Sequence, residues 1–289
     1  MYYGLVMVSV VLYGIAFKLK DIYKSVSGDG DGIRATLKYT VTSSLAALVV
    51  LLVINKFKLG FTLFSLVMAL LTALNIFAFS LCSFKALGRI NLSLYSLYSM
   101  LGGMLLPFFQ GILFFGEAIT IAKIICVAVL TVALMLTVKG DRKSGGFIYY
   151  LGIFFFNGMS GVLTKIFTSA PYPKTDSGSY AILTVLCAVA VSLLLLLTVF
   201  RSREKSREKP RPIAVGLAAA EGSVYRVADL LLVVALLHLD ASVQYPMVTG
   251  GVMIVSTIIC FFDRNRPSKK EILSVLLAFL GTLALFLPV

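Results

Sequence analysis

Charged residues are scarce in this chain. Asp, Glu, Lys and Arg make up 13% of its 289 residues and hydrophobic residues 59%, whereas soluble proteins carry about 25% charged residues. There are too few polar side chains to cover a soluble globule, which excludes a water-soluble enzyme. The apolar runs are continuous over about 20 residues and do not alternate with polar positions, so a transmembrane β-barrel is also excluded.

The signatures of metal, disulfide and nucleotide chemistry are also missing. The four cysteines lie inside apolar runs without ligand spacing, and the only histidine is His238. The sequence contains neither an HExxH zinc motif nor a GxxxxGK[ST] nucleotide motif. We therefore expect no metal, no cofactor and no enzymatic activity.

The net charge of +13 does not indicate a nucleic-acid partner, because the Lys and Arg residues lie in short gaps between the apolar runs. That placement is typical of membrane topology, and the expected surroundings are a lipid bilayer. The runs predict an all-α polytopic protein whose helices are each long enough to cross about 30 Å of hydrocarbon. The ten predicted helices are 2–17, 36–54, 62–84, 91–115, 119–138, 147–168, 179–200, 213–237, 241–262 and 270–288.

An internal repeat divides these ten helices into two halves of five. Gly14 and Lys18 recur as Gly161 and Lys165, at a shift of 161 − 14 = 147 residues. An odd number of helices per half makes the halves cross the membrane in opposite senses, and such inverted repeats place a substrate site near the midplane between them. The predicted halves are residues 1–140 and 141–289, with a charged loop at 201–212.

The stretch Ala86–Leu136 resembles the last two helices of an EamA-type repeat in the drug/metabolite transporter superfamily. In that family a helix rich in small residues carries a proline and a Gly-Glu pair opens the next helix; Pro107 and Gly116-Glu117 occupy these places. The second half departs from the pattern, with Asp263-Arg264 where the first has Gly116-Glu117. The resemblance implies a multipass carrier of small organic metabolites or drugs that works by alternating access.

The distribution of Lys and Arg predicts the orientation. Nineteen of them lie in or beside the gaps after the odd-numbered predicted helices, and 5 lie in or beside the other gaps. The positive-inside rule places the richer side in the cytoplasm, so both termini are expected outside the cytoplasm of a plasma or inner membrane. The resemblance implies the opposite orientation, and we follow the charge count.

The predicted helix 213–237 carries Glu221, Arg226 and Asp229 near its middle. A charge at the bilayer centre costs about 2.5–3.5 kcal/mol, so these side chains must pair with one another or face a hydrated cavity. At 100° per residue they share one arc of the helix with Tyr225. A single polar stripe of this kind is typical of a helix that lines a cavity.

Two interpretations of this stripe stay open. Arg226 and Asp229 form a buried pair that only joins helices, or Arg226 binds an anionic group of a substrate, such as a carboxylate or phosphate. In the second case Glu221 or Asp229 is a candidate for a coupling proton, because burial favours the uncharged form of a carboxyl group. The counterparts of the charged residues in the first half are neutral: Thr72, Phe77 and Ser80.

Further polar residues at membrane depth are candidates for substrate binding. Asn75 and Gln244 serve either that purpose or interhelical hydrogen bonding, and the tyrosines are alternatively anchors at the membrane interface. The function predicted is secondary transport of a small molecule, with a non-transporting sensor or assembly subunit and a membrane-embedded enzyme as the alternatives. The complete set of predicted substrate-binding residues is Arg226, Tyr225, Glu221, Asp229, Asn75, Tyr95, Tyr98, Gln244 and Tyr245.

Overall fold

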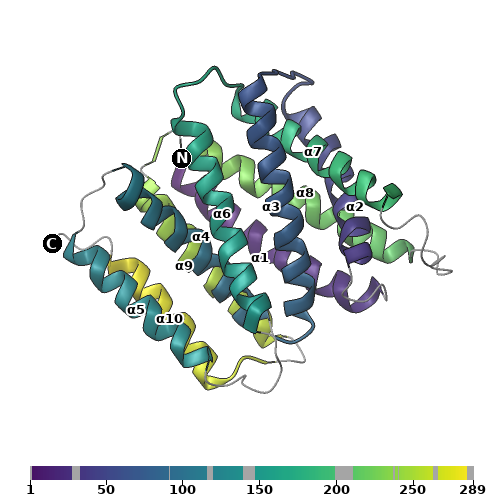
Figure 1. Cartoon of the computed structure of the whole chain (residues 1–289). Helices are drawn as coiled ribbons and strands as arrows, with labels where there is room; N and C mark the ends of the chain where they lie inside the picture. Colours follow the sequence, from purple (N-terminus) through teal and green to yellow (C-terminus); the bar gives the residue numbers. More distant parts are fainter. Residues whose placement is uncertain are drawn as a thin grey trace.

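The computed structural model describes residues 2–27, 33–90, 92–115, 120–138, 147–198, 211–236, 238–239, 241–262 and 266–284. Within these ranges the chain forms ten helices and no strand, which confirms the all-α prediction (Figure 1). The helices are α1 (Tyr2–Ser27), α2 (Ile33–Ile54), α3 (Leu63–Leu87), α4 (Leu92–Phe115), α5 (Ile121–Val138), α6 (Phe147–Ser169), α7 (Ser177–Thr198), α8 (Pro212–Leu236), α9 (Ala241–Phe261) and α10 (Lys269–Leu283).

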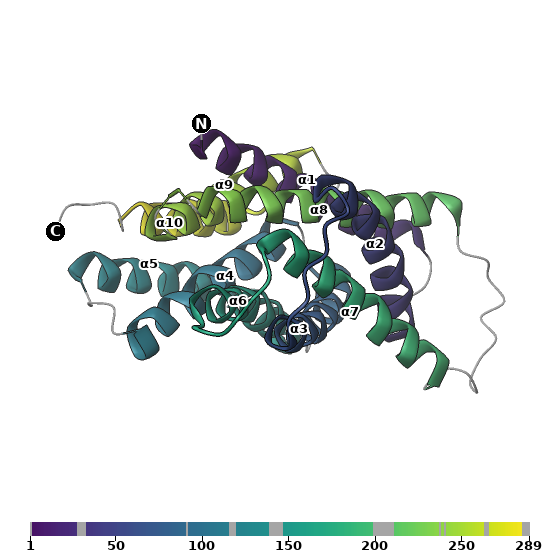
Figure 2. The same cartoon turned by 90° about the horizontal axis from the view of Figure 1, so that it is seen from above.

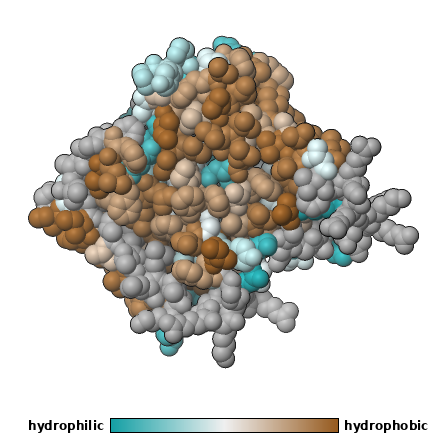
Figure 3. Space-filling view, viewed as in Figure 1, coloured by the Kyte–Doolittle hydropathy of each residue, from teal (hydrophilic) through white to brown (hydrophobic). Residues whose placement is uncertain are grey.

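Five of these helices are long and apolar enough to cross a membrane, judged by length and composition: α2, α3, α4, α6 and α7. Large hydrophobic side chains also cover much of the outer surface, among them Val49 (62% exposed) and Leu63 (73% exposed). Figure 3 shows one broad face that is mostly hydrophobic. Such a surface suits contact with lipid, whereas soluble monomers rarely expose apolar patches of this extent. The described structure is therefore that of a membrane-embedded helical protein.

The helices lie in two layers, seen edge-on in Figure 2. One layer holds α1, α8, α9 and α10, and the other holds α3, α4, α5 and α6. At one end α2 packs on α7 and α8, and at the other end α5 packs on α10 (Figure 1). The charged helix α8 packs on both α1 and α2.

The packing recurs at an interval of five helices. Helix α1 packs on α8 and α9, and helix α6 packs on α3 and α4. Helix α2 packs on α8, and helix α7 packs on α3. The pairs α2–α7, α4–α9 and α5–α10 each join a helix to the one five places later.

Helices α1 and α8 run antiparallel along almost their full length. The Tyr2 ring stacks on His238 at 3.9 Å between centroids, and the Ser9 hydroxyl donates to the Ala228 carbonyl at 3.2 Å. At the opposite end Arg211 lies just before α8 and donates to the Val26 carbonyl at 3.4 Å. This register brings the second half of α1 beside the charged residues of α8.

Helix α1 is longer than predicted. The predicted helix ended at residue 17, because Lys18, Lys20 and Lys24 were assigned to a loop, whereas α1 continues to Ser27. The prediction was wrong because it assigned these three lysines to the gap after the first apolar run, although lysine is a good helix former. Lys20 is in fact only 3% exposed.

Glycines permit a close contact between α4 and α6. A Cβ atom on Gly102 would overlap the carbonyl group of Phe154, which is backbone and cannot turn aside. On the facing helix, a Cβ atom on Gly158 would collide with the carbonyl oxygen of Gly102. The small residues of α4 therefore serve helix packing.

Candidate functional site

The centre of the site is an ion pair within α8. Arg226 Nη1 donates to Asp229 Oδ2 at 2.9 Å, and the two residues are one helical turn apart. The Tyr13 hydroxyl of α1 donates to the other oxygen of Asp229. The Tyr13 ring also meets the Tyr225 ring edge-on at 5.0 Å between centroids. Asp229 therefore holds both Arg226 and α1 in place.

Neither member of this pair is fully buried. The Arg226 side chain is 19% exposed and the Asp229 side chain is 33% exposed. Figure 3 shows a small hydrophilic area in the middle of the hydrophobic face, over the region where Figure 1 places α3 and α6. The predicted pairing of Arg226 and Asp229 is thus present, and the pair is not sealed completely.

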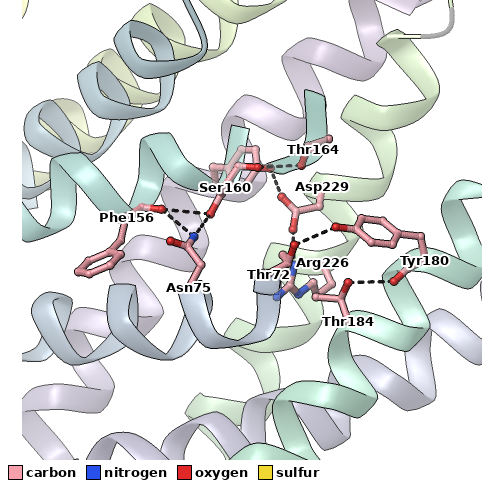
Figure 4. A network of polar contacts seen from close by, with 10 residues as sticks. Thr72, Asn75, Phe156, Ser160, Thr164, Tyr180, Thr184, Arg226 and Asp229 are labelled. Atoms are coloured by element: carbon pink, nitrogen blue, oxygen red, sulfur yellow. Dashed lines mark hydrogen bonds and ion pairs between the residues drawn. The ribbon is translucent and has the colours of Figure 1, made fainter. Parts of the chain in front are cut away.

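Polar side chains of α3, α6 and α7 surround the pair (Figure 4). The hydroxyl groups of Thr72 and Tyr180 share a hydrogen bond of 2.8 Å, and Tyr180 interacts electrostatically with Arg226. The Asn75 amide donates to the Phe156 carbonyl and to Ser160 Oγ, each at 2.8 Å. Asn75 therefore joins α3 to α6 by hydrogen bonds, which is the interhelical role predicted for it as an alternative to substrate binding.

A second pair of opposite charges lies farther along the same helix interface. Glu221 of α8 is 6% exposed and attracts Lys20 of α1. The Lys20 ammonium lies over three aromatic rings, at 5.4 Å from the Tyr39 centroid, 4.9 Å from that of Phe79 and 5.7 Å from that of Phe84. Of the charged residues in the described ranges, only Lys20 and Glu221 are buried.

The two pairs together hold two positive and two negative charges. Taking a single charge out of water costs several kcal/mol, and a nearby opposite charge offsets part of that cost. The equal numbers of cations and anions explain how α8 is accommodated between α1 and α2. Within the described ranges, no group of three or more His, Cys, Asp or Glu side chains is placed to hold a metal ion.

The other predicted residues lie at different distances from this centre. Tyr95 is completely buried, shares a hydrogen bond of 3.0 Å with Ser83, and interacts electrostatically with Glu221. Tyr98 packs against the Tyr150 ring of α6, at 5.6 Å between centroids. Tyr98 therefore contributes to the packing of α4 on α6, at the side of the site.

Of the two candidates on α9, Gln244 joins this helix to its neighbour. The Gln244 amide donates to the Leu232 carbonyl of α8 at 2.9 Å, about one turn beyond Asp229. Tyr245 is partly buried on the same helix. The Gly116-Glu117 motif of the family resemblance lies outside the described residues.

Several residues of the site were not predicted from the sequence. Tyr13 and Lys20 come from α1, Ser160 from α6 and Tyr180 from α7. One signal was present, because Tyr13, Phe17 and Lys20 follow the spacing i, i+4, i+7 and share a helix face. Extending the first predicted helix beyond residue 17 reveals that face.

Comparison with known proteins supports the fold and leaves the function open. No family model matches the chain, and no curated protein matches it. Twenty-two chains of solved structures do match. One, described only as "Crystal structure of protein", has a TM-score of 0.60 and 14% identity over 96% of each chain. The ten-helix arrangement is therefore similar to an experimentally determined fold over nearly its whole length.

Proposed function

We propose that this protein is a secondary transporter that carries a small organic metabolite or drug with an anionic group by alternating access. The observation that carries the proposal is the Arg226–Asp229 pair, which lies at mid-helix among membrane-type helices and keeps accessible area. A guanidinium group is permanently charged and offers a planar fork that matches a carboxylate or phosphate. Within the described residues, the guanidinium donates a hydrogen bond to Asp229 from Nη1, and its other nitrogens remain available for a ligand.

The packing supports two inverted repeats, residues 1–140 and 141–289, that span the membrane ten times. Gly14 of α1 lies against Val255 of α9, and Gly161 of α6 lies against Pro107 of α4. These two contacts are equivalent under the repeat, since 161 − 14 = 147 and 255 − 107 = 148. Inverted repeats place the substrate site between the halves, where α8 meets helices of the first half.

The geometry also suggests how a proton and an anion would be coupled. Asp229 competes with any incoming anion for the Arg226 guanidinium. A proton on Asp229 removes that competition, so proton binding and anion binding favour each other by the same free energy. Glu221, which faces Lys20, is the second carboxylate available for such a proton.

The alternative is a sensor or assembly subunit in which the pair only joins helices. The two hydrogen bonds that Asp229 accepts, from Arg226 and Tyr13, favour it, because they make Asp229 an effective link between α1 and α8. This alternative predicts that Arg226→Ala changes stability without changing the binding of any small molecule.

A ligand screen distinguishes the two functions. We would measure the melting temperature of the purified protein with a panel of small carboxylates, phosphates and their neutral amides, since a ligand of the folded state raises it. Compounds that bind would then be tested for uptake into proteoliposomes. Arg226→Ala should abolish both signals with normal membrane insertion, and Arg266→Ala, an exposed arginine, should keep both. Uptake that persists in Arg226→Ala would refute the assigned site.

A further inference from the structure

The buried Lys20 is the most unusual feature that the transport proposal leaves unused. Its stem belongs to α1, and its ammonium group is held against the rings of Tyr39, Phe79 and Phe84 from α2 and α3. These three rings are 3%, 7% and 1% exposed, so the enclosure is nearly dry. We call Tyr39, Phe79 and Phe84 the aromatic cage.

The chemistry of the cage is that of a cation site. Ring faces attract a cation within about 6 Å of the centroid, and the attraction grows when water is excluded. Glu221 adds a buried negative charge that acts on the same ammonium. The Tyr39 hydroxyl is also buried, and it interacts electrostatically with Glu221. A carboxylate and three aromatic rings, one of them with a hydroxyl group, thus lie around one small cationic group.

We propose that the aromatic cage and Glu221 form a binding site for an organic ammonium group, and that Lys20 fills this site as a tethered occupant in the conformation described here. The site lies next to the anion-binding Arg226 on the same helix. Glu221 and Arg226 are five residues apart, which is about 7.5 Å along an α-helix.

The role of this second site rests on the proposed transport function. A cargo with both an ammonium and an anionic group would place the first at Glu221 and the second at Arg226, while Lys20 leaves the cage. The spacing of Glu221 and Arg226 favours a cargo whose ammonium and anionic groups lie several ångströms apart. Molecules of this kind have an amino group separated from a carboxylate or phosphate by a chain of several atoms.

Shortening Lys20 tests the site directly. Lys20→Ala removes the tethered ammonium and leaves its place in the cage empty, so that tetramethylammonium can enter. We expect this cation to raise the melting temperature of the variant in a saturable way, by roughly 2–5 °C at ten times its dissociation constant. tert-Butyl alcohol, which has a similar shape and no charge, should give no such rise. Lys20→Met, which keeps the cage filled with an uncharged chain, should also give none.

The role of Glu221 is tested in the same format. In the double variant Lys20→Ala, Glu221→Gln, the effect of tetramethylammonium should fall at least tenfold in apparent affinity. No stabilisation of folded Lys20→Ala, equal stabilisation by the alcohol, or an unchanged effect in the double variant would each overturn the proposal.

A substitute pair of variants and a comparison with transport separate the possible results. If Lys20→Ala does not fold, the pair Lys20→Arg and Lys20→Met replaces it: a cation site predicts a clearly higher melting temperature for the arginine variant, and equal values would overturn it. Binding of tetramethylammonium by a protein that carries no cargo would support the cage and refute transport. Transport of a cargo by a protein that does not bind tetramethylammonium would support the transport function and refute the cage.

Discussion

The Arg226–Asp229 pair gives the most quantitative prediction. Removing one partner of a fully buried pair costs about 3–5 kcal/mol, and removing an exposed one costs about 0–1 kcal/mol. The side chains are 19% and 33% exposed, so the pair lies between these limits. We expect Arg226→Ala and Asp229→Ala each to lower the free energy of unfolding by about 1–3 kcal/mol.

The double variant separates the pair from its surroundings. If the charges stabilise each other, Arg226→Ala combined with Asp229→Ala costs less than the two single changes together, by about 1–2 kcal/mol. Thermal unfolding in detergent measures this, since 1 kcal/mol shifts the melting temperature by about 2–4 °C in a chain of this size class. Strictly additive losses would refute the claim that the pair is coupled.

The same substitution of Arg226 should also weaken the binding of an anionic ligand. A hydrogen bond to a charged group contributes about 1.5–3 kcal/mol, so the loss of Arg226 should weaken an anionic ligand roughly 10- to 150-fold. Arg226→Lys keeps the charge without the planar fork and should give an intermediate loss. Unchanged affinity in Arg226→Ala would leave the pair with a packing role alone.

Three other regions of the molecule give predictions. Gly102→Ala should prevent close packing of α4 on α6 and abolish the folded protein, measured as loss of the monodisperse peak in gel filtration. At its control, Gly216→Ala, the added Cβ meets no atom of another described segment within 4 Å, so this change should be neutral or stabilising by up to about 1 kcal/mol. Asn75→Ala should lower the melting temperature by about 2–8 °C and leave anion affinity within about threefold, because it removes an α3–α6 link rather than a charge. In a cysteine-free background, a cysteine replacing the exposed Lys58 should react with an impermeant reagent added outside cells and one replacing Arg266 should not; the reverse result would show cytoplasmic termini.

The sequence was sufficient for the parts of the structure that depend on local pattern. All ten helices were predicted, and the charged residues of α8 were identified because their cost in a membrane does not depend on fold. The partners of those residues were not predictable, because Tyr13 is 216 positions away from Asp229 and only the packing of α1 on α8 brings them together. Lys20 was missed for a different reason: its charge was taken to mean exposure, whereas three rings and a carboxylate keep it inside.

The balance of two cations and two anions along α1 and α8 has an electrical consequence for a carrier. Moving one elementary charge through the membrane field changes the free energy by about 2.3 kcal/mol per 100 mV. A set of internal charges that sums to zero contributes almost no such work when it moves as a unit. Under the proposed transport function, the return of the empty carrier should therefore be indifferent to membrane voltage. Any voltage dependence measured during transport would then report the charge of the cargo and of the ions that accompany it.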